Sequence, residues 1–180
     1  MLIYVNGDGH ASAAEAINQY KTAGEDSNLT YMGRLPHPEN LAVSWGKMLS
    51  LALRAGILCE AGSDNTIDTI IASTRKYIAD KGTDALVIIQ WPDTTGMEHK
   101  LWELHQELDS QNVKHIFFNS SIPISKQYDW GRNYIVDTYK SKLESANIET
   151  VAPNSDYFGK DGHSVWNRFL LNHIIKNKFI

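Results

Sequence analysis

Short apolar segments alternate with longer segments of helical periodicity along this chain. Residues 85–89 are apolar without interruption, which is typical of a strand whose two faces are both buried. Parallel strands need a crossover connection, and helices between successive strands provide it in βαβ units. The sequence therefore predicts a mostly parallel sheet that helices cover on both faces.

The individual elements follow from apolar runs, periodicity and end signals. The expected strands cover residues 2–6, 57–61, 84–91 and 114–119, with a weaker candidate at 147–151. The expected helices cover residues 11–23, 38–54, 64–81, 96–110 and 163–177. The first of these helices rests on a capping-box spacing between Ser12 and Glu15. Residues 120–140 are irregular, and we expect a long loop there with at least one helical turn.

Composition limits the classes of protein that need to be considered. The 180 residues are 42% hydrophobic and 21% charged, which suits a globular chain, and we expect one domain over residues 1–180. A net charge of −4 argues against nucleic acid as a partner. We expect no membrane segment and no secretory leader, and the single cysteine, Cys59, fits a cytoplasmic location. The sequence indicates no cofactor and does not determine the oligomeric state.

Polar residues follow several of the expected strands. In an open parallel sheet the carboxyl ends of the strands form the ligand-binding edge. The residues that should gather there are Asp8, Gly9, His10, Gly62, Ser63, Asn65, Trp91, Asp93, Asn119 and Ser120, with Asp156, Asp161 and His163 from the loop before the last helix. The alternative is that Asp8, Ser63 and Asp64 only cap helices.

The segments at these strand ends resemble the motif blocks of the SGNH (GDSL-type) hydrolase family, especially divergent members of the kind found in phage genomes. The blocks are Gly7-Asp8-Gly9, Ala61-Gly62-Ser63-Asp64-Asn65, Gln90-Trp91-Pro92-Asp93 and Asp161-Gly162-His163. The resemblance covers nearly the whole chain in element order. It implies a three-layer αβα sandwich with a parallel, flavodoxin-like sheet of about five strands.

Several family positions carry other residues in this chain. Gly9 stands where the family has its nucleophilic serine, and Pro92 stands where it has the oxyanion asparagine. Gly62 matches the glycine whose N–H contributes to the oxyanion hole, and Asp93 matches the aspartate of the third block. His163 follows Asp161 by two residues rather than three, and a second alignment places Tyr157 at the position of the catalytic histidine.

These departures argue against the family's usual chemistry. Acyl transfer requires a nucleophile, a base and N–H donors for the oxyanion. Glycine offers no nucleophile, and proline offers neither a side-chain amide nor a backbone N–H. Among the nearby hydroxyl groups, Ser12 is more simply a helix cap and Ser63 has no identifiable base. We therefore expect no conventional serine-esterase mechanism.

The tripeptide Asp-Gly-His occurs twice, at residues 8–10 and 161–163. In extended segments residues two apart project to the same side, so Asp8, His10, Asp161 and His163 could converge on a divalent metal. The alternative is that both glycines only form turns. Trp91 and Trp130 are core candidates that could instead line a carbohydrate or aromatic ligand site.

Three functions remain open at this point. The first is a binding protein for an acyl, ester or glycan ligand, with Gly9, Gly62, Ser63, Asn65 and Trp91 as binding residues. The second is a hydrolase with rewired or metal-assisted machinery, in which Asp8, His10, Asp93 and His163 act on an activated water. The third is a structural or interaction protein, for example a virion or assembly component.

Overall fold

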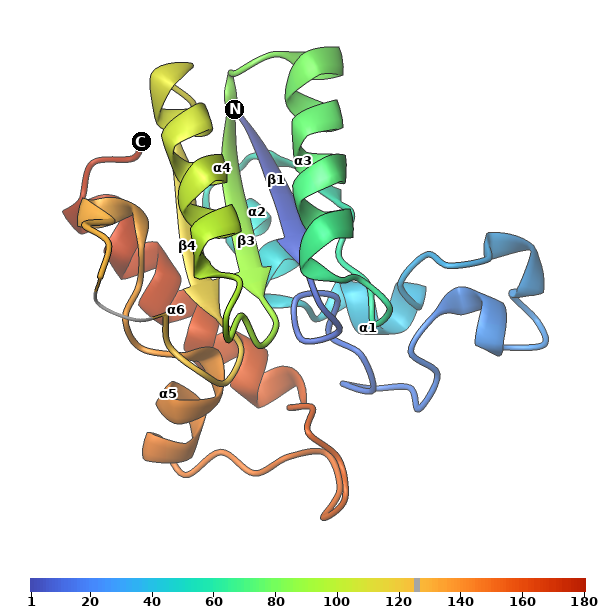
Figure 1. Cartoon of the computed structure of the whole chain (residues 1–180). Helices are drawn as coiled ribbons and strands as arrows, with labels where there is room; N and C mark the ends of the chain where they lie inside the picture. Colours follow the sequence, from blue (N-terminus) through green and yellow to red (C-terminus); the bar gives the residue numbers. More distant parts are fainter. Residues whose placement is uncertain (125–126) are drawn as a thin grey trace.

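The computed structural model describes residues 1–124 and 127–180. Its sheet consists of β1 (Leu2–Gly7), β2 (Gly56–Cys59), β3 (Ala85–Trp91) and β4 (His115–Asn119). The strand order is β2-β1-β3-β4 and every pairing is parallel (Figure 1). β3 is buried along its whole length, as its uninterrupted apolar sequence predicts.

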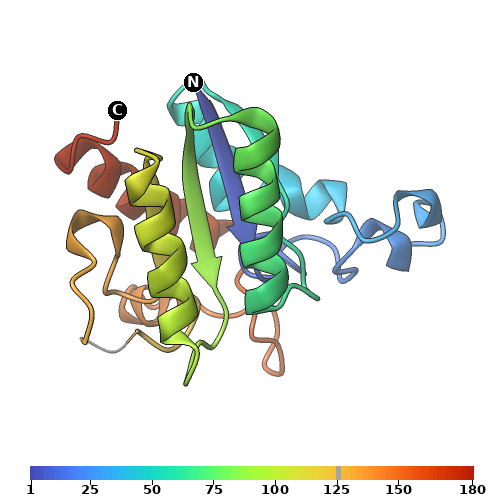
Figure 2. The same cartoon turned by 45° about the horizontal axis from the view of Figure 1, so that its top comes forward.

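Helices cover both faces of this sheet. α3 (Ile67–Lys81) and α4 (Glu98–Ser110) lie on one face, and α2 (Trp45–Ala52) and α6 (Lys160–Lys176) lie on the other (Figures 1 and 2). Alternate residues of β1 serve the two layers, since Ile3 and Val5 pack with α2 and α6 whereas Tyr4 packs with α3. The predicted three-layer αβα architecture is confirmed.

The expected helix over residues 11–23 was wrong. These residues form successive turns, with left-handed backbone at Ala13 (φ 58°) and Glu15 (φ 64°). The Ser12 hydroxyl donates to the carbonyl of Gly9 at 3.0 Å and does not cap a helix. The chain then runs out to one side of the molecule through two short 3₁₀ turns, Ala23–Glu25 and Thr30–Met32 (Figures 1 and 2). Tertiary contacts have replaced the local helical preference here.

Residues 17–36 form this outlying segment, and Asn40 binds its first residues. It lies in α1 (Pro38–Ala42), is fully buried, and accepts hydrogen bonds from the N–H groups of Ile17 and Asn18 at 3.0 and 2.8 Å. Its amide donates to the carbonyls of Asn18 and Tyr20. These four bonds take the place of the helical hydrogen bonds that residues 17–20 lack.

The strand count and the division of one expected helix also differ from expectation. The sheet has four strands rather than about five, because Thr150 forms only an isolated antiparallel bridge with Phe158. The expected helix 38–54 is divided into α1 and α2, with the Ser44 side chain capping α2. The irregular region leads into α5 (Tyr139–Ser145), which packs against α6.

α6 begins at Lys160, so Asp161 and His163 lie in its first turn and not in the preceding loop. Successive helical residues turn by about 100°, so two residues two positions apart diverge. The shared direction expected for Asp161 and His163 is therefore absent. In the described part of the chain, no helix is both long enough and apolar enough to cross a bilayer.

Candidate functional site

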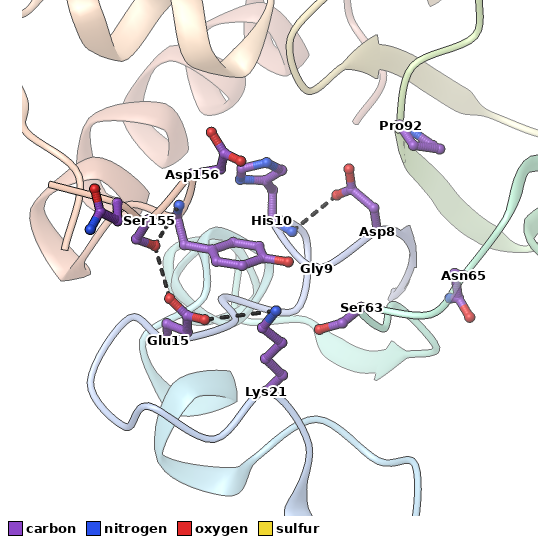
Figure 3. A pocket seen from close by; sticks show the side chains of 12 residues that line it. Asp8, Gly9, His10, Glu15, Lys21, Ser63, Asn65, Pro92, Ser155 and Asp156 are labelled. Carbon is purple, nitrogen blue, oxygen red and sulfur yellow. Dashed lines mark hydrogen bonds and ion pairs between the residues drawn. The ribbon is translucent and has the colours of Figure 1, made fainter. Parts of the chain in front are cut away.

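A cavity of about 380 Å³ opens at the carboxyl end of β1 (Figure 3). β2 lies on one side of β1 and β3 on the other, so this is the point at which the strand order reverses and where open α/β sheets bind ligands. The lining is mostly polar and comes from the segments after β1, β2 and β3 and from the loop before α6. Its residues are Asp8, Gly9, His10, Glu15, Lys21, Ser63, Asn65, Pro92, Asn154, Ser155, Asp156 and Tyr157.

Asp8 is fixed by a chain of hydrogen bonds across the carboxyl ends of the strands. Its carboxylate accepts the N–H of His10 at 3.0 Å and the Ser120 hydroxyl at 2.7 Å. Ser120 in turn accepts from the buried amide of Gln90 at 3.3 Å, and Gln90 accepts the indole N–H of Trp45 at 2.9 Å. The chain holds the carboxylate in one orientation at the cavity.

Gly9 lies directly against Tyr157. A Cβ at position 9 would lie 2.6 Å from the phenol oxygen of Tyr157 and 2.8 Å from the nearest ring carbon. The phenol therefore occupies the space that a serine side chain at position 9 would need. Burial and then the Asp8 carboxylate raise the pKa of Tyr157, while the nearby Ser63 hydroxyl lowers it. The net rise keeps the phenol neutral and able to donate a hydrogen bond at physiological pH.

Two polar atoms of the lining side chains have no hydrogen-bond partner among the described residues. They are Nδ1 of His10 and Oγ of Ser63, and both atoms are shielded from solvent. The His10 ring lies between two tyrosines, with ring centroids 4.9 Å from Tyr157 and 5.7 Å from Tyr139. Buried polar atoms are nearly always satisfied, so two unsatisfied atoms at one cavity indicate a place for a ligand or water.

The groups expected to stabilise an oxyanion are engaged or absent. The N–H of Gly62 donates to the carbonyl of Gly7 at 3.1 Å. The Asn65 amide donates to the carbonyls of Gly7 and Glu60 at 2.9 and 2.8 Å. Pro92 does line the cavity, but it has no N–H to offer. Asn65 and Gly62 thus tie the end of β1 to the segment that follows β2.

Glu15 and Lys21 belong to the cavity although the sequence did not identify them. They face each other on one wall, with Asp8 on the opposite side (Figure 3). Lys21 Nζ lies 3.9 Å from Glu15 and 5.6 Å from the centroid of the Tyr157 ring, and Ser155 donates to Glu15 at 2.8 Å. The sequence did not predict these contacts because residues 11–23 were expected to form a helix. The turns that follow Gly9 instead bring Glu15 back to the cavity.

Two residues predicted for the site lie elsewhere. Trp91 is fully buried and packs edge-on against Phe117 beneath α3 and α4. Side chains alternate along a strand, so Gln90 faces the opposite layer and joins the chain to Asp8 while Trp91 points away. Asp93 is exposed, and its carboxylate accepts hydrogen bonds from the backbone N–H and the hydroxyl of Thr95. Both bonds lower the pKa of the Asp93 carboxyl, and the bond from the N–H has the larger effect. Neither Trp91 nor Asp93 lines the cavity.

His163 was also predicted for the site but lies behind it. It is 1% exposed, its Nδ1 accepts the N–H of Trp45 at 3.3 Å, and the Tyr139 hydroxyl is 3.3 Å from the same atom. Burial lowers the pKa of His163 to about 3, so the imidazole is neutral. His163 is a core residue of α6.

Asp161 and His163, two of the four residues considered as possible ligands of a divalent metal, do not line the cavity with Asp8 and His10. Asp161 lines a separate shallow depression with residues 147–151. Over residues 1–124 and 127–180, no group of three or more histidines, cysteines or carboxylates is arranged to hold a metal ion. Trp130 lines another cavity of about 290 Å³ with Tyr128 and Tyr134.

Comparison with solved structures identifies a protein of similar fold. It comes from Desulfitobacterium hafniense DCB-2 and is described as a lipolytic protein of the G-D-S-L family. The two folds superpose with a TM-score of 0.62, the match covers 96% of this chain and 98% of the other, and the sequences are 12% identical. No protein-family model and no curated protein sequence matches the chain. At this identity the likeness concerns the fold alone, a parallel sheet with helices on both faces.

Proposed function

We propose that this chain is an SGNH-hydrolase-like binding protein. Its cavity holds a small ligand of the acyl, ester or glycan class and performs no conventional serine-esterase reaction. The observation that carries this proposal is the packing of Tyr157 onto Gly9. The position from which a serine would attack has no hydroxyl of its own, and a phenol fills the adjacent space. Losing a serine nucleophile alone removes most of the rate enhancement of a catalytic triad.

The other parts of an esterase site point the same way. The N–H of Gly62 is bonded to Gly7, and Pro92 provides no donor, so a developing oxyanion would have little to bind. His163 is buried behind the cavity, where it cannot take a proton from a substrate or water. The cavity itself remains open and polar, which favours ligand binding over a purely structural role.

A panel of p-nitrophenyl esters of increasing acyl length tests the proposal. We expect no turnover above buffer, with or without added Zn²⁺ or Mn²⁺. Hydrolysis by the unmodified protein that is lost in His10→Ala but retained in His99→Ala would contradict it. His99 is the matched control because it is an exposed histidine on α4, away from the cavity.

A rewired hydrolase is the second candidate, and one arrangement favours it. Asp8 and His10 both line the cavity, and Asp8 is held rigidly by Ser120. In that case the pair would act on a water molecule as acid and base, without Asp93 and His163. The same ester panel distinguishes the two functions. A rewired hydrolase should hydrolyse an ester and lose that activity in Asp8→Asn, whereas the binding protein should show no turnover in either form.

A further inference from the structure

The charge of the cavity limits what it can bind. Three carboxylates line it, those of Asp8, Glu15 and Asp156, against one lysine, Lys21. Lys21 lies 3.9 Å from Glu15, so its charge is already partly balanced within the wall. Asp156 is exposed and lies 3.7 Å from Lys140 Nζ, so its charge is partly balanced as well. The Asp8 carboxylate is left to set the sign of the field, which disfavours an anionic ligand.

The hydrogen-bonding groups point to hydroxyl-bearing ligands. Ser63 Oγ makes no hydrogen bond of good geometry among the described residues, although it is near enough to the Tyr157 phenol to lower the pKa of that group, and it can both donate and accept. The neutral phenol of Tyr157 lies beside it and offers a second hydroxyl of the same kind. His10 adds an unpartnered ring nitrogen. Such mixed donors and acceptors match the alternating capacity of sugar hydroxyls, and they would stay unsatisfied against an alkyl chain.

Size gives a third limit. Small-molecule sites span about 300–1,000 Å³, and a cavity of about 380 Å³ lies at the low end of that range. Most of the lining residues are polar, and the apolar groups among them include Pro92 and the ring of Tyr157. A long acyl chain would therefore find neither the length nor the apolar surface that it needs.

We infer that the cavity binds a small hydroxyl-rich molecule that is neutral or positively charged, of the sugar or amino-sugar class. The Tyr157 hydroxyl contacts its hydroxyl groups, and the Asp8 carboxylate faces any cationic substituent. Rotation of the Ser63 side chain about χ1 brings its shielded Oγ to the ligand as a second contact. This inference rests on the proposed function, in which the cavity binds its ligand without turning it over.

The test compares four probes by NMR titration of the isotope-labelled full chain. Glucose, glucosamine, glucuronate and octanoate differ in charge and in hydroxyl content. We expect glucose and glucosamine to shift the amide signals of Gly9 and Ser63, with glucosamine binding more tightly. Glucuronate and octanoate should bind at least about tenfold more weakly, which corresponds to roughly one good hydrogen bond or charge contact.

Two variants locate the binding. Ser63→Ala and Tyr157→Phe should each weaken glucosamine binding about five- to tenfold. Their matched controls, Ser27→Ala and Tyr31→Phe, change exposed residues on the outlying segment and should leave binding unchanged.

The possible failures can be told apart. The inference is overturned if glucuronate or octanoate binds most tightly, or if neither glucose nor glucosamine binds. Neither result affects the proposed function, which depends on the absence of esterase activity. Unchanged glucosamine affinity in both Ser63→Ala and Tyr157→Phe also overturns it. Turnover of p-nitrophenyl acetate by the same samples overturns the proposed function, whatever the order of the four affinities.

Discussion

The phenol oxygen of Tyr157 lies 2.6 Å from the place where a side chain at Gly9 would begin. The two residues are 148 positions apart in sequence and form one packed unit at the end of β1. Position 9 cannot gain a side chain while position 157 holds a tyrosine, because a Cβ at position 9 and the phenol need the same space. This steric exclusion explains why the cavity has no attacking group at position 9.

We predict that Gly9→Ala destabilises the protein by about 1–3 kcal/mol, because the added methyl overpacks the contact with the phenol. In a Tyr157→Ala background the same change should cost much less. A double-mutant cycle from urea unfolding measures the coupling between the two positions. Equal costs in both backgrounds would show that the Cβ does not compete with the phenol.

The Ser120 hydroxyl links Asp8 to Gln90. Ser120→Ala removes the donor to the carboxylate and the acceptor for a buried amide, so we predict a loss of about 1–3 kcal/mol in the free energy of unfolding. The neighbouring Ser121 is exposed, and Ser121→Ala should change stability by less than about 0.5 kcal/mol. Chemical denaturation of the two variants makes the comparison, and equal effects would remove the assigned role of Ser120.

Asn40 should control the local stability of the outlying segment. Asn40→Ala removes all four hydrogen bonds to residues 17–20, and we predict a destabilisation of about 2–3 kcal/mol. Hydrogen exchange at the amides of Ile17 and Asn18 should accelerate more than exchange in β3. Asn28→Ala, an exposed change on the same segment, is the control. Unaltered exchange at both amides in Asn40→Ala would contradict the role given to this side chain.

Two buried histidines make stability depend on pH. His105 Nδ1 lies 2.7 Å from His115 Nε2, and Nδ1 of His115 lies 2.8 Å from the carbonyl of Val113. Burial lowers both pKa values, that of His115 to about 4. The unfolded chain then binds more protons than the folded chain between about pH 6.5 and pH 4. Stability is therefore full above pH 6.5 and falls as the pH drops through this window.

The quantity to measure is the slope of the free energy of unfolding against pH. It should approach about 1.4 kcal/mol per pH unit for each extra proton that the unfolded chain binds. The double variant His105→Leu/His115→Leu should show a shallower slope from pH 6.5 to pH 4, whatever its absolute stability. His99→Gln, which changes an exposed histidine on the same helix as His105, should retain the original slope. A double variant with an unaltered slope would exclude the pair as its source.

The sequence by itself determined the layers of the fold and the edge where the cavity opens. Uninterrupted apolar runs identify strands that are buried on both faces, and segments of helical periodicity identify the helices between them. These signals are local, so they can be read without knowing the rest of the chain. The placing of Asp8, Gly9, His10, Ser63 and Asn65 at the ends of β1 and β2 followed from the parallel topology alone.

Tertiary structure decided what those strand ends contain. Trp91 and Gln90 are neighbours in sequence, yet strand pleating directs only Gln90 toward the hydrogen bonds that hold Asp8. His163 is in the core because it lies within α6 and accepts the backbone N–H of Trp45. Glu15 reaches the cavity because Asn40 bonds the backbone of residues 17–20 and the Ser155 hydroxyl donates to the Glu15 carboxylate. Each of these outcomes depends on contacts between distant segments, whose free energies outweigh the local preferences that a sequence pattern expresses.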